Sequence, residues 1–210
     1  MTATAFQASL LDCAPSVEVG PLGETVQRRQ LTDGAWIDLR PRWITGADTL
    51  FERLREQVPW HAERRPMYDR VVDVPRLLSF FDEGAPLPDP SLVEAKRALD
   101  EHYAAQLGEP FATAGLCLYR DGRDSVAWHG DRIGRGNTHD TMVALIVLGA
   151  PRALLLRPRG GGPAIRYDLG HGDLLVMGGS CQRTWEHAVP KTGKPVGPRI
   201  SVQYRPHGVR

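Results

Sequence analysis

The sequence predicts a mainly β fold of the sandwich, barrel or jelly-roll type, preceded by an N-terminal extension of mixed α/β character. Two observations after residue 110 lead to this fold class. Short apolar runs are separated there by turn sequences, and 16 of the 22 glycines lie in this part of the chain. Short strands at this spacing favour an antiparallel β fold over a parallel βαβ sheet.

About eight strands are expected in this region, each a short run of β-favouring residues bounded by turns. Turn signals include Asp121-Gly122-Arg123-Asp124 and the glycine run between Arg159 and Pro163. The expected strands cover residues 115–120, 126–129, 142–148, 153–157, 164–168, 173–177, 184–189 and 199–205.

The first half of the chain predicts two helices and a hairpin. The helices are expected to begin near Thr49 and Ser91, each followed three residues later by a glutamate, as in a capping box. Gly108 ends the second helix. Residues 67–81, rich in valine and aromatic residues, favour a strand or hairpin, and residues 82–90 form a proline-rich linker.

Length suits one domain, in which residues 1–110 form the extension and residues 111–210 the core. The net charge of +1 is unevenly distributed between these parts. The core contains 14 Lys and Arg against 7 Asp and Glu, a balance of +7, and the extension has a balance of −6. A basic core suits a phosphate-bearing partner, but an ordinary solvated surface explains the same charges equally well.

Composition also bears on the cellular compartment. The chain has no apolar run of about 18 residues, as a membrane span requires, and no basic segment before the apolar residues of its N-terminus. Its three cysteines are an odd number without zinc-ligand spacing. We therefore expect a cytoplasmic protein without membrane association, in a reducing environment. A monomer is expected as well, although the sequence carries no signal for the oligomeric state.

The triplet His-x-Asp occurs twice, as His129-Gly130-Asp131 and as His171-Gly172-Asp173. On a strand, residues two apart project from the same face, so either pair could reach one metal ion. The glycines on both sides of His171 indicate a turn, with Asp173 opening a strand. The first triplet ends a strand and enters a glycine-rich loop, which favours it as the metal site.

His187 is the candidate for a third ligand, because it lies on a predicted strand between Trp185 and Val189. Two histidines and one carboxylate on one side of Fe(II) leave positions open for O2 and a chelating cosubstrate. A lone histidine is more often a core residue, so this assignment depends on the strand that follows it.

That last strand, residues 199–205, alternates strictly between polar and apolar side chains. Arg199, Ser201, Gln203 and Arg205 share one face. The two arginine Cα atoms would lie roughly 20 Å apart, and two extended arginines can close that gap onto a small dicarboxylate. The alternative is an edge strand whose polar face contacts water.

In order and spacing, these motifs resemble the AlkB family of nucleic-acid dealkylases, across residues 111–206. The resemblance implies a double-stranded β-helix (jelly roll) as the catalytic core. It implies oxidative dealkylation of N-alkylated nucleobases in DNA or RNA, a DNA-repair reaction that uses Fe(II), 2-oxoglutarate and O2. The implied iron ligands are His129, Asp131 and His187, and the implied 2-oxoglutarate contacts are Tyr119, Arg199, Ser201 and Arg205. Cys117 and Ser201 stand where the family commonly has asparagine.

Residues 67–76 resemble the nucleotide-recognition hairpin of family members that act on duplex DNA. Tyr68 would insert into the base stack, Arg76 would approach the flipped base, and Phe80 or Phe81 would stack on it. Packing roles for these aromatic residues are the alternative. Trp185 is a further candidate substrate contact. Ile133 stands where several members have an acid that reads the base.

Two other functions remain open at this point. The same fold could hydroxylate or demethylate a small metabolite or a protein side chain, as the near-zero net charge allows. Alternatively, the chain could be a non-catalytic nucleic-acid-binding protein, although an intact set of motif residues opposes this. Whether Arg135 and Arg152 contact phosphate is also open.

Overall fold

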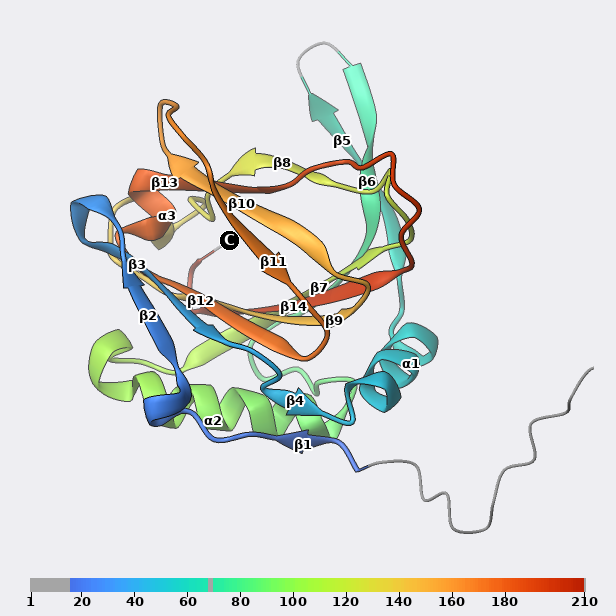
Figure 1. Cartoon of the computed structure of the whole chain (residues 1–210), viewed down its shortest axis with the longest axis horizontal. Helices are drawn as coiled ribbons and strands as arrows, with labels where there is room; N and C mark the ends of the chain where they lie inside the picture. The colour runs from blue at the N-terminus through green and yellow to red at the C-terminus, as the bar shows by residue number, and fades with distance from the viewer. Residues whose placement is uncertain (1–15, 68–69, 210) are drawn as a thin grey trace, which may run out of the picture.

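The computed structural model describes residues 16–67 and 70–209, without the side chains of residues 65–67 and 70–72. Two antiparallel β-sheets pack face to face, and helices cover the outer face of the larger one (Figure 1). The expected mainly β, jelly-roll fold is confirmed. Within the described part of the chain, no helix has the length and apolar character that crossing a membrane requires.

The larger sheet combines strands from both halves of the sequence. Its eight strands are, in spatial order, β2 (Gln27–Gln30), β3 (Ala35–Arg40), β12 (Asp173–Gly179), β9 (Val143–Gly149), β14 (Arg199–Pro206), β7 (Phe111–Tyr119), β6 (Arg70–Phe81) and β5 (His61–Met67). The smaller sheet has the order β11 (Ile165–Leu169), β10 (Arg152–Pro158), β13 (Trp185–Val189) and β8 (Val126–His129). β1 (Glu18–Val19) pairs with β4 (Ile44–Thr45).

All eight strands expected after residue 110 are present, with ends that differ by a few residues. β2 and β3 were not expected from the sequence. β3 pairs with β12 over six residues, from Ala35 opposite Gly179 to Arg40 opposite Leu174. The first half of the chain therefore supplies strands to the sheet that carries β14.

The larger sheet separates two hydrophobic cores. On β9, Val143, Leu145 and Val147 pack in the core between the sheets, whereas Ala144, Ile146 and Leu148 pack toward the helices. This alternation follows from the two-residue period of a strand. Because both faces of β9 are buried, its sequence is a continuous apolar run and not an alternating one.

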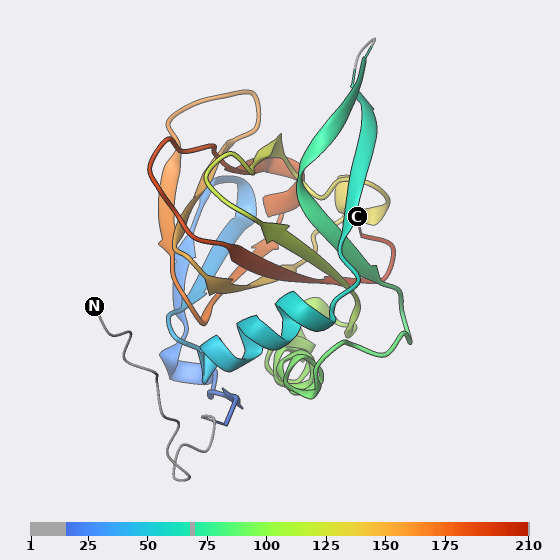
Figure 2. The same cartoon turned by 90° about the vertical axis from the view of Figure 1, so that its right-hand side faces the viewer.

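Two helices cover the outer face of this sheet, α1 (Ala47–Gln57) and α2 (Pro90–Leu107) (Figure 2). Both start earlier than expected. α1 follows Gly46, whose φ is +63°, so Thr49 lies inside the first turn. At α2 the carboxylate of Asp89 accepts a hydrogen bond of 2.9 Å from the backbone N–H of Ser91, so Asp89 is the cap. Gly108, with φ of +74°, ends α2 as predicted.

The remaining helical segments are short. They are α3 (Cys181–Thr184) and three 3₁₀ turns, η1 (Gly23–Thr25), η2 (Thr32–Gly34) and η3 (Arg135–Asn137).

Within residues 67–81, expected as a strand or hairpin, Arg70–Phe81 form the single strand β6. It pairs with β5, which was not expected, and the resulting hairpin projects beyond the edge of the larger sheet (Figures 1 and 2). Its base is held by pairing of β6 with β7, from Leu77 opposite Leu118 to Phe81 opposite Ala114. Tyr68, the residue expected to insert into the base stack, lies outside the described residues.

Candidate metal centre

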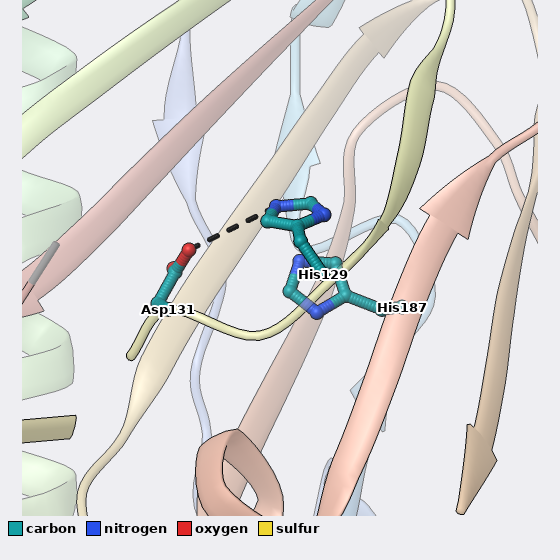
Figure 3. Close-up of side chains that lie close together, drawn as sticks. All are labelled: His129, Asp131 and His187. Atoms are coloured by element: carbon teal, nitrogen blue, oxygen red, sulfur yellow. Dashed lines mark ion pairs between the residues drawn. The ribbon is translucent and has the colours of Figure 1, made fainter. Parts of the chain in front are cut away.

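Strand register brings two histidines together. β8 and β13 pair so that His187 lies directly opposite His129, and their ring centroids are 4.2 Å apart. Asp131 follows two residues after His129, in the loop that leaves β8. One ligand atom from each of these residues lies within 4.8 Å of the other two, and Figure 3 shows the three side chains converging.

His129 is oriented for metal binding by its own strand. Its Nδ1 lies 2.9 Å from the backbone carbonyl of Ala127. A carbonyl only accepts, so Nδ1 carries the proton and Nε2 keeps its lone pair. That Nε2 lies 3.8 Å from Oδ1 of Asp131, with room for an ion between ligands of the triad.

The other two ligands are held in the protonation states that a metal requires. Burial alone would raise the pKa of Asp131, but its interactions with the cationic Arg205 and with the two histidines lower it to about 2. Nε of Arg205 donates to Oδ2 of Asp131 at 2.8 Å. Burial lowers the pKa of His187 to about 3, so its imidazole is neutral. Nitrogen and carboxylate donors in this number are the set expected for non-haem Fe(II).

The side chains of the second His-x-Asp triplet accept hydrogen bonds from backbone N–H groups and so stabilise a turn. His171 Nδ1 accepts a hydrogen bond from the backbone N–H of Gly149 at 2.7 Å. The carboxylate of Asp173 accepts from the N–H groups of Arg42 and Gly170, at 2.8 and 2.7 Å. Among the described residues, the triad His129, Asp131 and His187 is the metal-ligand group that forms.

β14 lies between β7 and β9, so the alternative of an edge strand with its polar face in water is wrong. Its polar face points into the space between the sheets. Arg199 is 1% exposed, and none of its three guanidinium nitrogens has a hydrogen-bond partner in the described part of the chain. Burial lowers its pKa to about 10. A buried cation without a partner is costly, so this side chain fits the carboxylate of a bound acid.

Tyr119 and Ser201 stand beside Arg199. Tyr119 is opposite Arg199 in the β7–β14 register, and the guanidinium lies 5.5 Å from its ring centroid. Burial raises the pKa of Tyr119 to about 12, so the phenol remains a hydrogen-bond donor. These residues line a small inner cavity of about 70 Å³ that also reaches Arg205 and the triad.

A larger cavity of about 890 Å³ lies on the other side of the triad. His129, Asp131 and Arg205 line both cavities, so the metal centre stands between them. Arg76 also lines both. Phe80 lines the larger one and is 43% exposed.

Two of the expected substrate contacts are corrected by the structure. Phe81, next to Phe80 on β6, points to the opposite face and packs against the core beneath the helices. Trp185 is 5% exposed, packs in the core between the sheets and lies outside the cavity lining. Strand alternation decides the outcome for Phe81, and the face of β6 that meets the cavity could not be assigned from sequence. Trp185 shares a face of β13 with His187 but is buried in the core two residues before it.

The two arginines with open roles have protein partners. Arg152 is buried and donates to the backbone carbonyls of Asp121, Asp124 and Pro190 at 3.0, 3.0 and 2.7 Å. Arg135 forms an ion pair with Glu109. The hydrogen bonds of Arg152 therefore connect the loop at Asp121–Asp124 with the loop at Pro190.

Sequence reasoning missed Gln182 and Glu63. Gln182 is buried on α3, and its side-chain oxygen accepts from the backbone N–H of Asp131 at 2.9 Å. Glu63 lines the larger cavity from β5. Neither residue belongs to a motif, so no signal in the sequence distinguished them.

Residues 41–205 match the family model described as the 2OG-Fe(II) oxygenase superfamily. The chain belongs to this superfamily. Membership implies Fe(II), 2-oxoglutarate and O2, and the donor set and the unpartnered Arg199 fit the first two.

Curated relatives carry the AlkB name. "Alpha-ketoglutarate-dependent dioxygenase alkB homolog 3" of Bos taurus is 31% identical over 182 residues, which are 76% of this chain and 61% of that protein. "DNA oxidative demethylase ALKBH2" of Homo sapiens is 25% identical over 178 residues, 76% of this chain and 68% of that protein. The predicted AlkB membership is confirmed. The chain spans about three fifths of the length of the AlkB homolog 3 relative.

Solved structures agree on the fold. The structure of OsALKBH1 superposes with a TM-score of 0.59 at 15% identity, over 84% of this chain and all (100%) of that one. An oxidoreductase of the 2OG-Fe(II) oxygenase family from Burkholderia pseudomallei gives 0.54 at 12% identity, over 80% and 84% of the two chains. At these identities the likeness establishes the fold alone.

Proposed function

We propose that this protein is an Fe(II)/2-oxoglutarate-dependent dioxygenase that oxidatively dealkylates N-alkylated nucleobases in DNA or RNA. The observation that carries the proposal is the metal triad standing between two cavities, one of which contains a buried, unpartnered arginine. The names of the AlkB relatives support the substrate class. A cytoplasmic role in DNA repair, carried out as a monomer, is part of the same proposal.

The residues divide the work between the two cavities. His129, Asp131 and His187 would hold Fe(II), and Arg205 keeps the carboxylate of Asp131 ionised and oriented. Arg199 would bind one carboxylate of 2-oxoglutarate, with the phenol of Tyr119 and the hydroxyl of Ser201 beside it. Arg205 would approach the other carboxylate end of 2-oxoglutarate. The inner cavity also has apolar walls, which exclude water from the cosubstrate.

When bound, the metal with O2 and 2-oxoglutarate supplies the oxidation, in which the cosubstrate becomes succinate and CO2 and the N-alkyl carbon is hydroxylated and leaves as an aldehyde. The protein positions the substrate base next to the metal centre. A volume of about 890 Å³ suits one flipped nucleotide. Arg76 and Phe80 on its walls would contact that base.

Turnover with methylated single- and double-stranded DNA and RNA tests the proposal. We expect succinate and formaldehyde in equal amounts, with a methylated oligonucleotide stimulating both. Asp131→Ala should abolish turnover and Fe(II) binding, because it removes a ligand. The control is His171→Ala, from the second triplet, which should retain the metal content and turnover of the wild type.

The alternatives give different results. Succinate formation that no methylated oligonucleotide stimulates would point to a metabolite or a protein side chain as the substrate. Oligonucleotide binding without any succinate would point to a non-catalytic binding protein.

A further inference from the structure

The three side chains of the candidate metal centre are held in two different ways. His129 and His187 lie on paired strands, so the register of β8 and β13 fixes both of them. Asp131 lies two residues beyond the end of β8, in the loop that runs to η3. Strand pairing therefore does not position this carboxylate, and contacts of the loop must do so.

α3 contacts this loop from one side. The side-chain oxygen of Gln182, which is 1% exposed, accepts from the backbone N–H of Asp131 at 2.9 Å. A Cβ atom at position 130 would lie 2.5 Å from the backbone carbonyl oxygen of Gln182, so Gly130 allows the loop to approach α3 this closely. A buried N–H group needs an acceptor, and Gln182 supplies it at the metal ligand itself.

The segment that follows β14 contacts the loop from another side. The backbone N–H of Arg135 donates to the carbonyl of Gly208 at 2.9 Å. The next residue, Val209, is 1% exposed and packs in the core between the sheets. A Cβ atom at Gly136 would overlap the carbonyl oxygen of Asp131 and would lie 3.5 Å from Cγ1 of Val209. Gly136 therefore lies directly between Val209 and the backbone of the metal ligand.

These two contacts act on the backbone of the loop, whereas Arg205 acts on the side chain. Nε of Arg205 donates to Oδ2 of Asp131 and orients the carboxylate. That bond does not hold the backbone from which the carboxylate extends. Contacts that orient a metal ligand typically change metal affinity about 10- to 100-fold, because a displaced ligand no longer matches the geometry that the ion requires.

We infer that Gln182 and Val209 form a clamp on the loop that carries Asp131, and that they are positioning residues which set the affinity of the centre for its divalent metal ion. The inference rests on the proposed metal-dependent function. It gives a role in the site to two residues that line neither the larger nor the inner cavity.

Mn²⁺ titration of the metal-free protein measures the Kd of the centre without any turnover. Gln182→Met keeps the length of the side chain and removes its strong acceptor, and it should raise the Kd for Mn²⁺ about 10- to 100-fold. Val209→Ala shortens the side chain that packs on Gly136, and it should raise the Kd about 10-fold, the lower end of that range. In both variants, succinate formation should return close to the wild-type rate when Fe(II) is saturating, because all three ligands remain.

Val176→Ala on β12 is the matched control, because it removes the same atoms from the core beneath the helices, where Val176 is fully buried (0% exposed). It should lower the unfolding temperature of the metal-free protein as Val209→Ala does and leave the Kd for Mn²⁺ unchanged. Thermal unfolding checks that each variant is folded.

The possible results separate the clamp from the metal centre itself. A wild-type Kd in folded Gln182→Met and Val209→Ala proteins overturns the inference and leaves the metal centre standing. An equal rise of the Kd in Val176→Ala also overturns it, because general loss of stability would then explain the effect. A wild-type protein that binds neither Mn²⁺ nor Fe(II) overturns the proposed function.

Discussion

At the scale of single residues, the site is a set of buried charges placed for groups that the protein binds. Asp131 has Arg205 as a partner, whereas the guanidinium of Arg199 has none among the described residues. Hydrophobic burial elsewhere in the fold must offset the cost of that cation until a carboxylate reaches it. At Arg199, the charge that would bind a carboxylate therefore lowers the stability of the ligand-free protein.

Arg199→Met tests this opposition. Replacing an unpartnered buried cation by an apolar side chain should stabilise the ligand-free protein by about 1–3 kcal/mol. The same change should raise KM for 2-oxoglutarate at least 100-fold, because the carboxylate loses its counter-charge. Thermal unfolding and succinate kinetics measure the two effects. Arg166→Met, on the exposed ion pair with Asp168, is the control and should change neither.

His187 links stability to pH. Its pKa falls from 6.5 to about 3 on folding, so below pH 6.5 the unfolded chain binds a proton that the native state excludes. Stability of the metal-free protein should therefore fall as pH decreases from 6.5 toward 3, by up to about 1.4 kcal/mol per pH unit. Chemical denaturation at several pH values measures the slope. His187→Gln should flatten it between pH 6 and 4, and an equal slope in both proteins would contradict this account.

At the scale of elements, the start of α2 differs from the position that its capping-box pattern predicts. For α2 the sequence pattern favoured Ser91 as the cap, whereas the structure uses Asp89, two residues earlier. In the structure Pro90 occupies the first turn, and Asp89 accepts from the N–H of Ser91 and lies 3.6 Å from Arg53. Proline is well tolerated at the first helical position, which moves the cap one residue before it.

Asp89→Ala should consequently destabilise the protein by about 1–2 kcal/mol, because a buried cap and an ion-pair partner are removed together. Ser91→Ala should change the free energy of unfolding by less than about 0.5 kcal/mol. Urea denaturation of the two variants decides between the caps. A larger loss from Ser91→Ala would restore the sequence-based assignment.

At the scale of the whole molecule, the site joins the two sheets. His129 and His187 come from the smaller sheet, and Arg199 and Arg205 come from β14 in the larger one. A metal ion with its cosubstrate would thus add contacts between layers that otherwise meet through apolar packing.

Ligands should therefore raise the unfolding temperature. Mn²⁺ as a redox-inert substitute with 2-oxoglutarate, at about 100 times its Kd, should contribute about 2.7 kcal/mol, a shift of roughly 5–10 °C for a chain of this size. Chelation should reverse the shift. Asp131→Ala should show little response to the metal, and a full response in that variant would contradict the assigned triad.

Local sequence patterns were sufficient to predict the strands after residue 110, the preference for the first His-x-Asp triplet, and the polar face of β14. These features depend on local periodicity and on turns, which a chain carries in its own order of residues. Local patterns left β2 and β3 unrecognised, because a short strand becomes stable only when the neighbouring strand pairs with it.

Which face of each strand meets the site depends on tertiary packing, and no local pattern predicts it. Tertiary packing placed His129 opposite His187, turned the polar face of β14 inward, moved Phe81 and Trp185 into cores, and brought Glu63 to the cavity wall. The physical reason is that register and burial arise from pairings between distant segments. A shift of one residue in such a pairing reverses the face of every side chain on the strand.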